Sequence, residues 1–219
     1  YPHLNVKIGA THAGVSVGED GATHQCNEDI ALMRTIPGMT IVNPSDAVEA
    51  RAAVEAALRT SGPFYLRFGR YALPVINDRP DYRFELGKGV LLADGDDVTL
   101  VATGLCVSLA LEARELLAAE GIGARVVNIH TIKPIDRALL VASAQKTGAV
   151  VTAEEHNIIG GLGGAVCEVL AEACPVPVQR VGMNDTYGHS GTVPALLEAY
   201  GLTAANIAAK AKAAIAMKK

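Results

Sequence analysis

Long hydrophobic runs and clusters of positive charge are both missing from this sequence of 219 residues. No apolar run reaches the roughly 20 residues of a transmembrane span, and no basic segment followed by an apolar one indicates a signal peptide. The formal net charge is −4, and only the tail beyond residue 209 is locally basic, as a solvated helix end would be. We therefore expect a cytoplasmic protein that binds neither nucleic acid nor a membrane surface.

Cysteine is also scarce, and its spacing matches no redox motif. Cys26, Cys106, Cys167 and Cys174 form no CxxC pair. The last two are spaced so that a helix would place them on one face. We expect all four to be reduced thiols in or near the core.

Half of the residues are apolar, which is enough for a substantial core, and the length suits one or two domains. Apolar and amphipathic runs alternate along the chain. We predict strands at residues 4–8, 39–42, 64–68, 98–104, 125–130, 149–153 and 178–182. We predict helices at residues 27–36, 45–60, 108–120, 135–144, 163–173, 193–199 and 206–216. This alternation predicts an α/β fold with mostly parallel strands covered by helices.

The alternation is interrupted between residues 71 and 96. Prolines, an Asp-Arg pair and an Asp-Gly-Asp turn indicate an ordered connector there. We place a domain boundary near residue 97. The sequence thus predicts a first domain at residues 1–75, a connector at 76–97 and a second domain at 98–219.

The segment richest in chemical groups is the turn GEDGATHQ at residues 18–25, with His12 shortly before it. Its glycines allow sharp bends and a close approach to a ligand, while Asp20 and His24 supply an acceptor and a titratable donor. Sugar hydroxyls and phosphates need such partners, although the pattern alone also fits a polar surface loop with an Asx-turn. A metal site is not indicated, because the two histidines lack the i, i+4 spacing of a helical zinc pair and no cysteine accompanies them.

A glycine-rich run at residues 158–166 follows a predicted strand and opens a predicted helix, where a dinucleotide-binding fingerprint would lie. Counting from Gly161, the third glycine position of that fingerprint holds Val166, and no acidic residue follows at the required distance. We interpret these glycines as sites of close packing between helix and sheet. The Glu-Glu-His segment at residues 154–156 is expected in an exposed loop at a strand end.

Several motifs together resemble the transketolase family. Matching motifs in the first half are Thr11-His12, GEDGATHQ, residues 29–39, Pro44-Ser45-Asp46, Gly62-Pro63 and the Arg-Phe-Gly-Arg run at 67–70. In the second half they are residues 98–104, the Lys-Pro-Ile-Asp turn at 133–136, residues 154–156 and the run at 158–166. The resemblance implies two three-layer α/β/α domains. The first would be an incomplete thiamine-diphosphate-binding (pyrimidine) domain, and the second a Rossmann-like transketolase C-terminal domain with a mostly parallel sheet.

The resemblance implies substrate roles for four residues. Asp20 and His24 match positions that hydrogen-bond ketose hydroxyls beside the reacting carbonyl, and His24 is the expected catalytic residue. His12 and Arg70 match positions that face the phosphate end of sugar phosphates. A guanidinium offers forked donors to phosphate, and an imidazole can relay a proton near neutral pH. Taken on their own, Arg70 would better fit a surface ion pair and His12 a strand-end histidine. We assign no catalytic role to His189.

The resemblance also implies what this chain needs from elsewhere. In this family the glutamate that activates the thiamine ring lies upstream of the matched segment, and the diphosphate and metal site belongs to an N-terminal domain. Because the sequence starts at Tyr1 and enters a strand at once, we expect a fragment or a subunit. Because the activating glutamate and the diphosphate site lie elsewhere, we expect this chain to be inactive and to bind no cofactor alone. Its expected partners are an N-terminal transketolase portion holding thiamine diphosphate with Mg²⁺ or Ca²⁺, sugar phosphates of the pentose phosphate pathway, and a second copy in a homodimer.

Two other interpretations stay open. Deoxyxylulose-phosphate synthase and the beta subunits of two-oxoacid dehydrogenases share this domain layout, although Glu19 and Gln25 around the DGATH core look like transketolase. A first domain with an open sheet edge also fits a non-catalytic assembly module.

Overall fold

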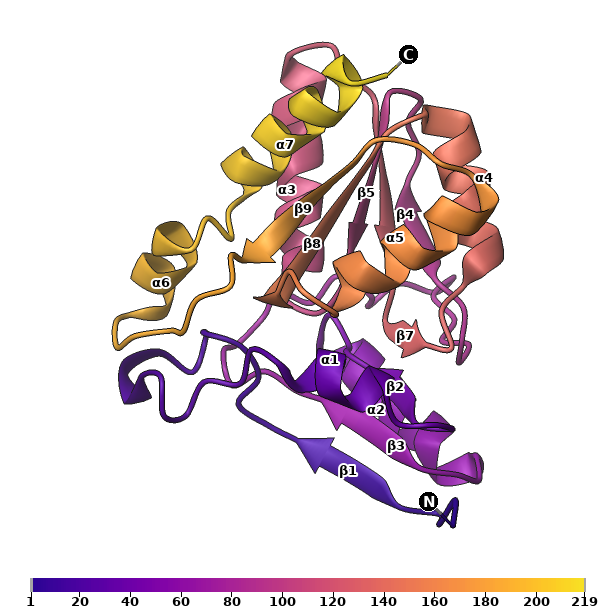
Figure 1. The fold of residues 1–219 in the computed structure, drawn as a ribbon, viewed down its shortest axis with the longest axis vertical. Helices are drawn as coiled ribbons and strands as arrows, with labels where there is room; N and C mark the ends of the chain where they lie inside the picture. The colour runs from indigo at the N-terminus through magenta and orange to yellow at the C-terminus, as the bar shows by residue number, and fades with distance from the viewer. Residues whose placement is uncertain (1, 219) are drawn as a thin grey trace.

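Two sheets organise the computed structural model, which describes residues 2–218 (Figure 1). The first sheet has the order β1-β3-β2-β7. Its strands are β1 (Lys7–Ala10), β2 (Thr40–Val42), β3 (Phe64–Arg67) and β7 (Thr131–Lys133). β1, β2 and β3 run parallel, whereas β7 pairs antiparallel with β2. The N-terminal region contributes three of these strands, and β7 comes from the second half of the chain.

Helices cover both faces of the first sheet. Successive side chains of a strand point to opposite faces, so each strand contributes to both layers of core. Phe64 and Leu66 of β3 pack with α2 (Ala47–Arg59), whereas Tyr65 between them joins the core on the other face with α1 (Asp29–Arg34). A short 3-10 helix, η1 (Gly18–Asp20), lies in the loop between β1 and α1. The predicted three-layer arrangement is confirmed.

The second sheet has the order β4-β6-β5-β8-β9. Its strands are β4 (Val90–Ala93), β5 (Val98–Ala102), β6 (Ala124–Asn128), β8 (Val150–Asn157) and β9 (Val178–Met183). Helices α3 (Cys106–Ala119) and α7 (Ala204–Ala216) cover one face, and α4 (Arg137–Thr147) and α5 (Leu162–Ala173) cover the other (Figure 1). β4 is antiparallel to its neighbour β6, and the other pairs of this sheet are parallel. The predicted mostly parallel sheet is therefore confirmed.

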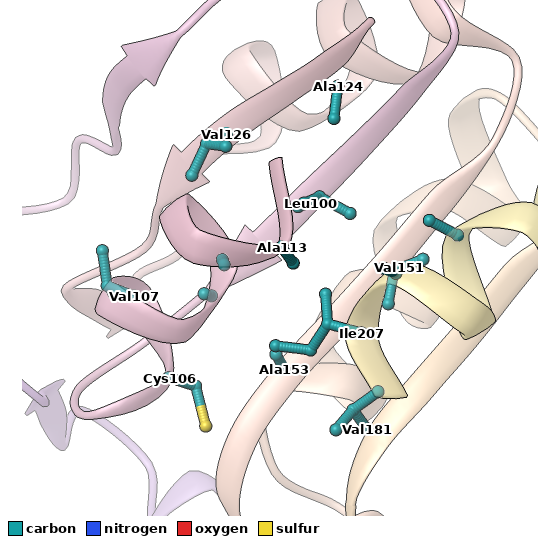
Figure 2. Close-up of a cluster of buried hydrophobic side chains, with 14 of the residues drawn as sticks. Leu100, Cys106, Val107, Ala113, Ala124, Val126, Val151, Ala153, Val181 and Ile207 are labelled. Atoms are coloured by element: carbon teal, nitrogen blue, oxygen red, sulfur yellow. The ribbon is translucent and has the colours of Figure 1, made fainter. Parts of the chain in front are cut away.

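The main core lies between this sheet and the helices α3 and α7 (Figure 2). Leu100 and Val151 project from neighbouring parallel strands towards Ala113 of α3 and Ile207 of α7. Small residues on both helices allow close packing against the sheet, and burial of this apolar area is the main source of stability. Cys106 is fully buried in this core, and all four cysteines are free thiols, as predicted.

Two strands differ from the sequence prediction. β4 lies within the predicted connector and before the predicted boundary near residue 97, yet it belongs to the second sheet through antiparallel pairing with β6. β7 has only three residues, and it returns to the first sheet instead of continuing the second. β4 is an apolar run of four residues inside the segment interpreted as a connector, and β7 has a single apolar residue, so each is defined as a strand by its partner.

A buried polar cluster joins the two domains at the start of α2. Asp46 caps the helix by accepting a hydrogen bond from Glu49 N at 2.8 Å. The Glu49 carboxylate accepts from Ser45 N at 2.7 Å, Tyr82 OH at 2.8 Å and Asn128 Nδ2 at 2.8 Å. Glu49 therefore connects the first domain, the connector and β6. None of the helices in residues 2–218 has the length and apolar content needed to cross a membrane.

Candidate functional site

The candidate site is built on the loop between β1 and α1. Ala13 and Gly14 form β-bridges with Cys26, so the loop closes on itself at its base. His12 stands just before this closure with φ of 64°, in the left-handed region that residues other than glycine rarely adopt. Such conformations gather at functional sites. The predicted turn at residues 18–25 is thus the outer part of a closed loop at the carboxyl end of β1.

Asp20 and Arg70 meet at the mouth of this loop. Arg70 Nη1 lies 3.2 Å from Asp20 Oδ2 and donates to Val17 O at 2.6 Å. Arg70 follows β3, which is parallel to β1, so the two residues come from the carboxyl ends of adjacent parallel strands. Ligands commonly bind at that edge of an α/β sheet. The Arg70 and Asp20 side chains are 48% and 47% exposed, so the ion pair adds little to the stability of the fold and is open to a ligand.

His12 and His24 lie on the same loop and are exposed. Each ring is held by the hydroxyl of the preceding threonine, with His12 Nδ1 2.8 Å from Thr11 Oγ1 and His24 Nδ1 3.0 Å from Thr23 Oγ1. Within residues 2–218, neither Nε2 makes a hydrogen bond and neither imidazole bonds to the Asp20–Arg70 pair. Both rings therefore keep Nε2 available for a ligand.

The second domain forms one wall beside Arg70. A surface cavity with a volume of about 370 Å³ opens there. It is lined by Ser16, Val17, Glu19, Arg70, Tyr71, Ala72, Thr192, Val193 and Pro194. The last three residues belong to the start of α6 (Val193–Ala199), and α6 packs against η1 (Figure 1). Any ligand on Arg70 would thus lie at a junction of the two domains.

The turn before α6 also contacts the loop. Gln25 Nε2 donates to His189 O at 3.0 Å, and Tyr200 OH lies 2.5 Å from His189 Nδ1. The His189 ring is therefore engaged with its own domain.

Beneath the loop lies a buried ionic network that the sequence analysis missed. Arg67 on β3 is completely buried and donates to Asp29 Oδ2 at 2.8 Å, Glu155 O at 2.9 Å and Cys26 O at 3.2 Å. Tyr65 OH adds a 2.7 Å hydrogen bond to the same Asp29 oxygen. Burial opposes ionisation, yet the Arg67 guanidinium keeps the pKa of Asp29 below its ordinary value. An arginine within an apolar strand was the available signal.

The prediction that residues 154–156 form an exposed loop is wrong, because they continue β8 and are buried. Glu154 accepts hydrogen bonds from Leu162 N at 2.6 Å and Gly163 N at 2.8 Å, at the first turn of α5. Burial raises the pKa of Glu154 to about 7, although the hydrogen bonds from these two amides lower it. The amides and the positive end of the helix dipole provide partners for a carboxylate that would otherwise be costly to bury.

The interpretation of the glycine-rich run as a packing feature is confirmed. A β-carbon on Gly161 would clash with the Glu154 carboxylate, and one on Gly163 would lie 2.9 Å from Thr152 Oγ1. Glu154 occupies the position at the helix N-terminus where a bound dinucleotide would place its pyrophosphate. The run therefore serves an internal carboxylate.

His156 links β8 to α1. Its Nδ1 donates to Asn157 O at 2.6 Å, and its Nε2 accepts from Ala31 N at 3.3 Å. Burial, reinforced by the nearby Arg67 charge, lowers the pKa of His156 to about 4. This histidine is thus a neutral structural residue in the domain junction.

No group of three or more His, Cys, Asp or Glu side chains within residues 2–218 is arranged to hold a metal ion.

Comparison with known proteins identifies both domains. The transketolase pyrimidine-binding domain model matches residues 2–75, and the transketolase C-terminal domain model matches residues 87–207. A 6-deoxy-6-sulfo-D-fructose transketolase subunit of Clostridium sp. is 48% identical over 94% of this chain and 64% of its own length. An apulose-4-phosphate transketolase subunit of Phocaeicola vulgatus is 42% identical over 92% of this chain and 64% of its own length.

Solved structures agree with these matches. A split-gene transketolase, described as an inactive beta4 tetramer, superposes with a TM-score of 0.93 at 53% identity, over all of this chain and 70% of that one. A transketolase from Pichia stipitis shares the fold, with a TM-score of 0.79 at 24% identity over 98% of this chain and 30% of that one. This chain spans about two thirds of the length of the two subunits above. The chain belongs to the transketolase family, of which it represents the C-terminal part, with a pyrimidine-binding domain followed by a transketolase C-terminal domain.

Proposed function

We propose that this chain supplies the sugar-phosphate-binding side of a two-carbon ketol transfer from ketose to aldose phosphates. The observation that carries the proposal is the exposed Asp20–Arg70 pair, which shares the carboxyl edge of β1 and β3 with His12 and His24. Anion donors and hydroxyl partners thus gather on one loop system. Sugar phosphates need both kinds of group.

In this proposal Arg70 binds the phosphate end of the sugar. A phosphate oxygen can accept from the guanidinium N–H groups that Val17 O does not occupy, and such charge-assisted bonds are stronger than neutral ones. The Asp20 carboxylate already holds the guanidinium in place at 3.2 Å. His12, with Nε2 free of hydrogen bonds within residues 2–218, adds a second donor for the phosphate.

Asp20 and His24 act at the reacting end. An ionised Asp20 accepts a hydrogen bond from a sugar hydroxyl of matching stereochemistry, and His24 Nε2 donates to, or takes a proton from, a hydroxyl next to the carbonyl. The Thr23 hydroxyl at His24 Nδ1 orients the ring. A positioned imidazole of this kind contributes about 10²- to 10⁴-fold to a proton-transfer step.

Transketolases depend on thiamine diphosphate, which supplies the electron sink for breaking and forming the carbon–carbon bond. We propose that the cofactor and a divalent ion, Mg²⁺ or Ca²⁺, are held mainly by a complementary N-terminal portion. We further propose that the complete enzyme contains two copies of this chain.

The donor sugar is a separate matter. The two subunits named above act, by their names, on a sulfo sugar and a sugar phosphate, and both substrates carry an anionic group. A 1-deoxy-D-xylulose-5-phosphate synthase from Heliobacterium modesticaldum is also 42% identical over 93% of this chain. An anionic sugar is common to all three names, which supports an anionic group as the ligand of Arg70 in this chain.

The direct test combines this chain with a matching N-terminal portion, thiamine diphosphate and Mg²⁺, and follows xylulose 5-phosphate with ribose 5-phosphate. We expect ketol transfer by the combination and none by either part alone. Turnover by this chain alone, or an inactive combination in which both parts are folded and associated, would contradict the proposal.

A further inference from the structure

We propose that Glu155 of the C-terminal domain is a positioning residue for the loop between β1 and α1, which carries His12, Asp20 and His24. The inference rests on the proposed function in one respect only, the identity of the ligand. An experiment without any substrate can test whether a carboxylate from the other domain holds the loop.

Glu155 contacts the loop directly. Its Oε1 accepts a hydrogen bond from Ser16 N at 2.6 Å, and both residues are buried. Gly14 passes so close to the carboxylate that a β-carbon there would clash with it, and its φ of 71° also favours glycine. The loop backbone is therefore shaped around this one side chain.

Arg67 ties the second stem of the loop to the same strand. Its Nη2 donates both to Glu155 O at 2.9 Å and to Cys26 O at 3.2 Å. Cys26 O in turn accepts from Gly14 N at 2.8 Å. The two stems are thus joined to each other and to β8, at the residue that carries the carboxylate.

The strand continues the attachment. Asn157 N donates to Asn27 O at 2.8 Å, one residue past the closure of the loop. β8 is an interior strand of the second sheet, paired on both sides by β5 and β9, so it is a rigid support. Side chains in binding sites keep their geometry when the groups beneath them are fixed in this way. His12, Asp20 and His24 all lie on the loop that this strand supports.

The neighbouring Glu154 provides a matched control. It is equally buried and lies on the same strand, but its carboxylate binds the first amides of α5 and makes no hydrogen bond to the loop within residues 2–218. Successive side chains of a strand point to opposite faces of the sheet, which explains why Glu154 contacts α5 and Glu155 contacts the loop. A general effect of neutralising a buried carboxylate would appear in both positions, whereas an effect on the loop is specific to Glu155.

The first experiment measures hydrogen–deuterium exchange in the full chain for wild type, Glu155→Gln and Glu154→Gln. We expect exchange within residues 13–18 to rise at least about 10-fold in Glu155→Gln, with little change there in Glu154→Gln. If Glu155→Gln does not fold, Glu155→Asp keeps the charge but shortens the reach to Ser16 N, and the same local rise is expected. Unchanged protection of this segment in the folded variant would overturn the inference.

The second experiment uses the chain assembled with the N-terminal portion and cofactor. We expect Glu155→Gln to raise the KM for sugar phosphates by about 10-fold with unchanged thiamine diphosphate affinity, and Glu154→Gln to leave this KM unchanged. An inactive wild-type assembly would contradict the proposed function while leaving the exchange result intact. An active wild type with equal KM values in Glu155→Gln would overturn the positioning role.

Discussion

Arg67 donates from Nε to Asp29 Oδ2 at 2.8 Å, and the two side chains are only 2% and 5% exposed. The pair joins β3 to α1 within the pyrimidine-binding domain. Because Arg67 also donates to Glu155 O, the same guanidinium spans the junction with the C-terminal domain. The free-energy cost of burying the Arg67 charge is offset only while all of these partners are present.

Replacing Arg67 with Ala should lower the free energy of unfolding by about 3 to 5 kcal/mol, because Asp29 would keep a buried charge without its partner. The matched control is Arg59→Ala, which removes an exposed ion pair on α2 and should cost about 0.5 kcal/mol or less. Urea unfolding followed by circular dichroism measures both. Equal costs for the two variants would contradict the structural role of Arg67.

Glu154 should make stability depend on pH. Its folded pKa of about 7 lies above the ordinary value of 4.5, so the folded chain binds more protons than the unfolded chain between these values. Its contribution to stability therefore falls as pH rises from 4.5 to 7, by about 3 kcal/mol in total. His156, with a pKa lowered to about 4, acts in the opposite direction between pH 4 and 6.5 and partly hides the effect in wild type.

The comparison with Glu154→Gln separates the two groups, because the variant keeps His156. Urea unfolding at intervals from pH 4.5 to 8 should show wild type losing stability relative to the variant as pH rises. A constant difference between the two proteins across this range would show that Glu154 does not titrate there.

Self-association is expected at the edge of the first sheet. β1 has one strand neighbour within residues 2–218, and Ile8 on the strand and Leu4 and Val6 just before it are exposed. An unpaired apolar edge favours pairing with another chain. At micromolar concentration the protein should sediment as a dimer or larger species, and Ile8→Lys should shift it towards monomer.

Leu116→Lys provides the control, since Leu116 is an exposed apolar residue on α3, away from this edge. A monomeric wild type would contradict the prediction. Equal shifts in the two variants would place the interface elsewhere.

The sequence predicted most of this architecture because the long central strands and helices carry their own periodicity. β5 and α5 are examples, since one is a mostly apolar strand that is buried throughout and the other has a clear apolar face. β4 was missed because it lies in the segment interpreted as a connector, and β7 because its three residues follow directly after β6 and pair with the first sheet. The sequence therefore showed local structure well and the contacts between domains poorly.

The same contrast holds for the site. His12, Asp20, His24 and Arg70 stand out in sequence because ionisable groups cluster in a glycine-punctuated turn. The supporting layer of Arg67 and Glu155 could not be assigned, because the two residues lie far apart in the chain and a charged residue at a strand end usually faces solvent. Their burial depends on partners that only folding brings together.

The most direct measurement of the central claim compares phosphorylated and unphosphorylated donors in the assembled enzyme. Arg70→Ala removes charge-assisted hydrogen bonds of about 1.5 to 3 kcal/mol, so affinity for xylulose 5-phosphate should fall about 10- to 150-fold while hydroxypyruvate is little affected. Arg83→Ala, at an exposed arginine of the connector, should change neither.

His24→Ala completes the measurement, because a group at the reacting end matters for every donor. Steady-state kinetics should show its turnover reduced about 10²- to 10⁴-fold with both xylulose 5-phosphate and hydroxypyruvate. The account predicts this split between the two variants. Equal harm to both donors by Arg70→Ala, or unchanged turnover in His24→Ala, would contradict the assignment of a phosphate end and a reacting end to this loop.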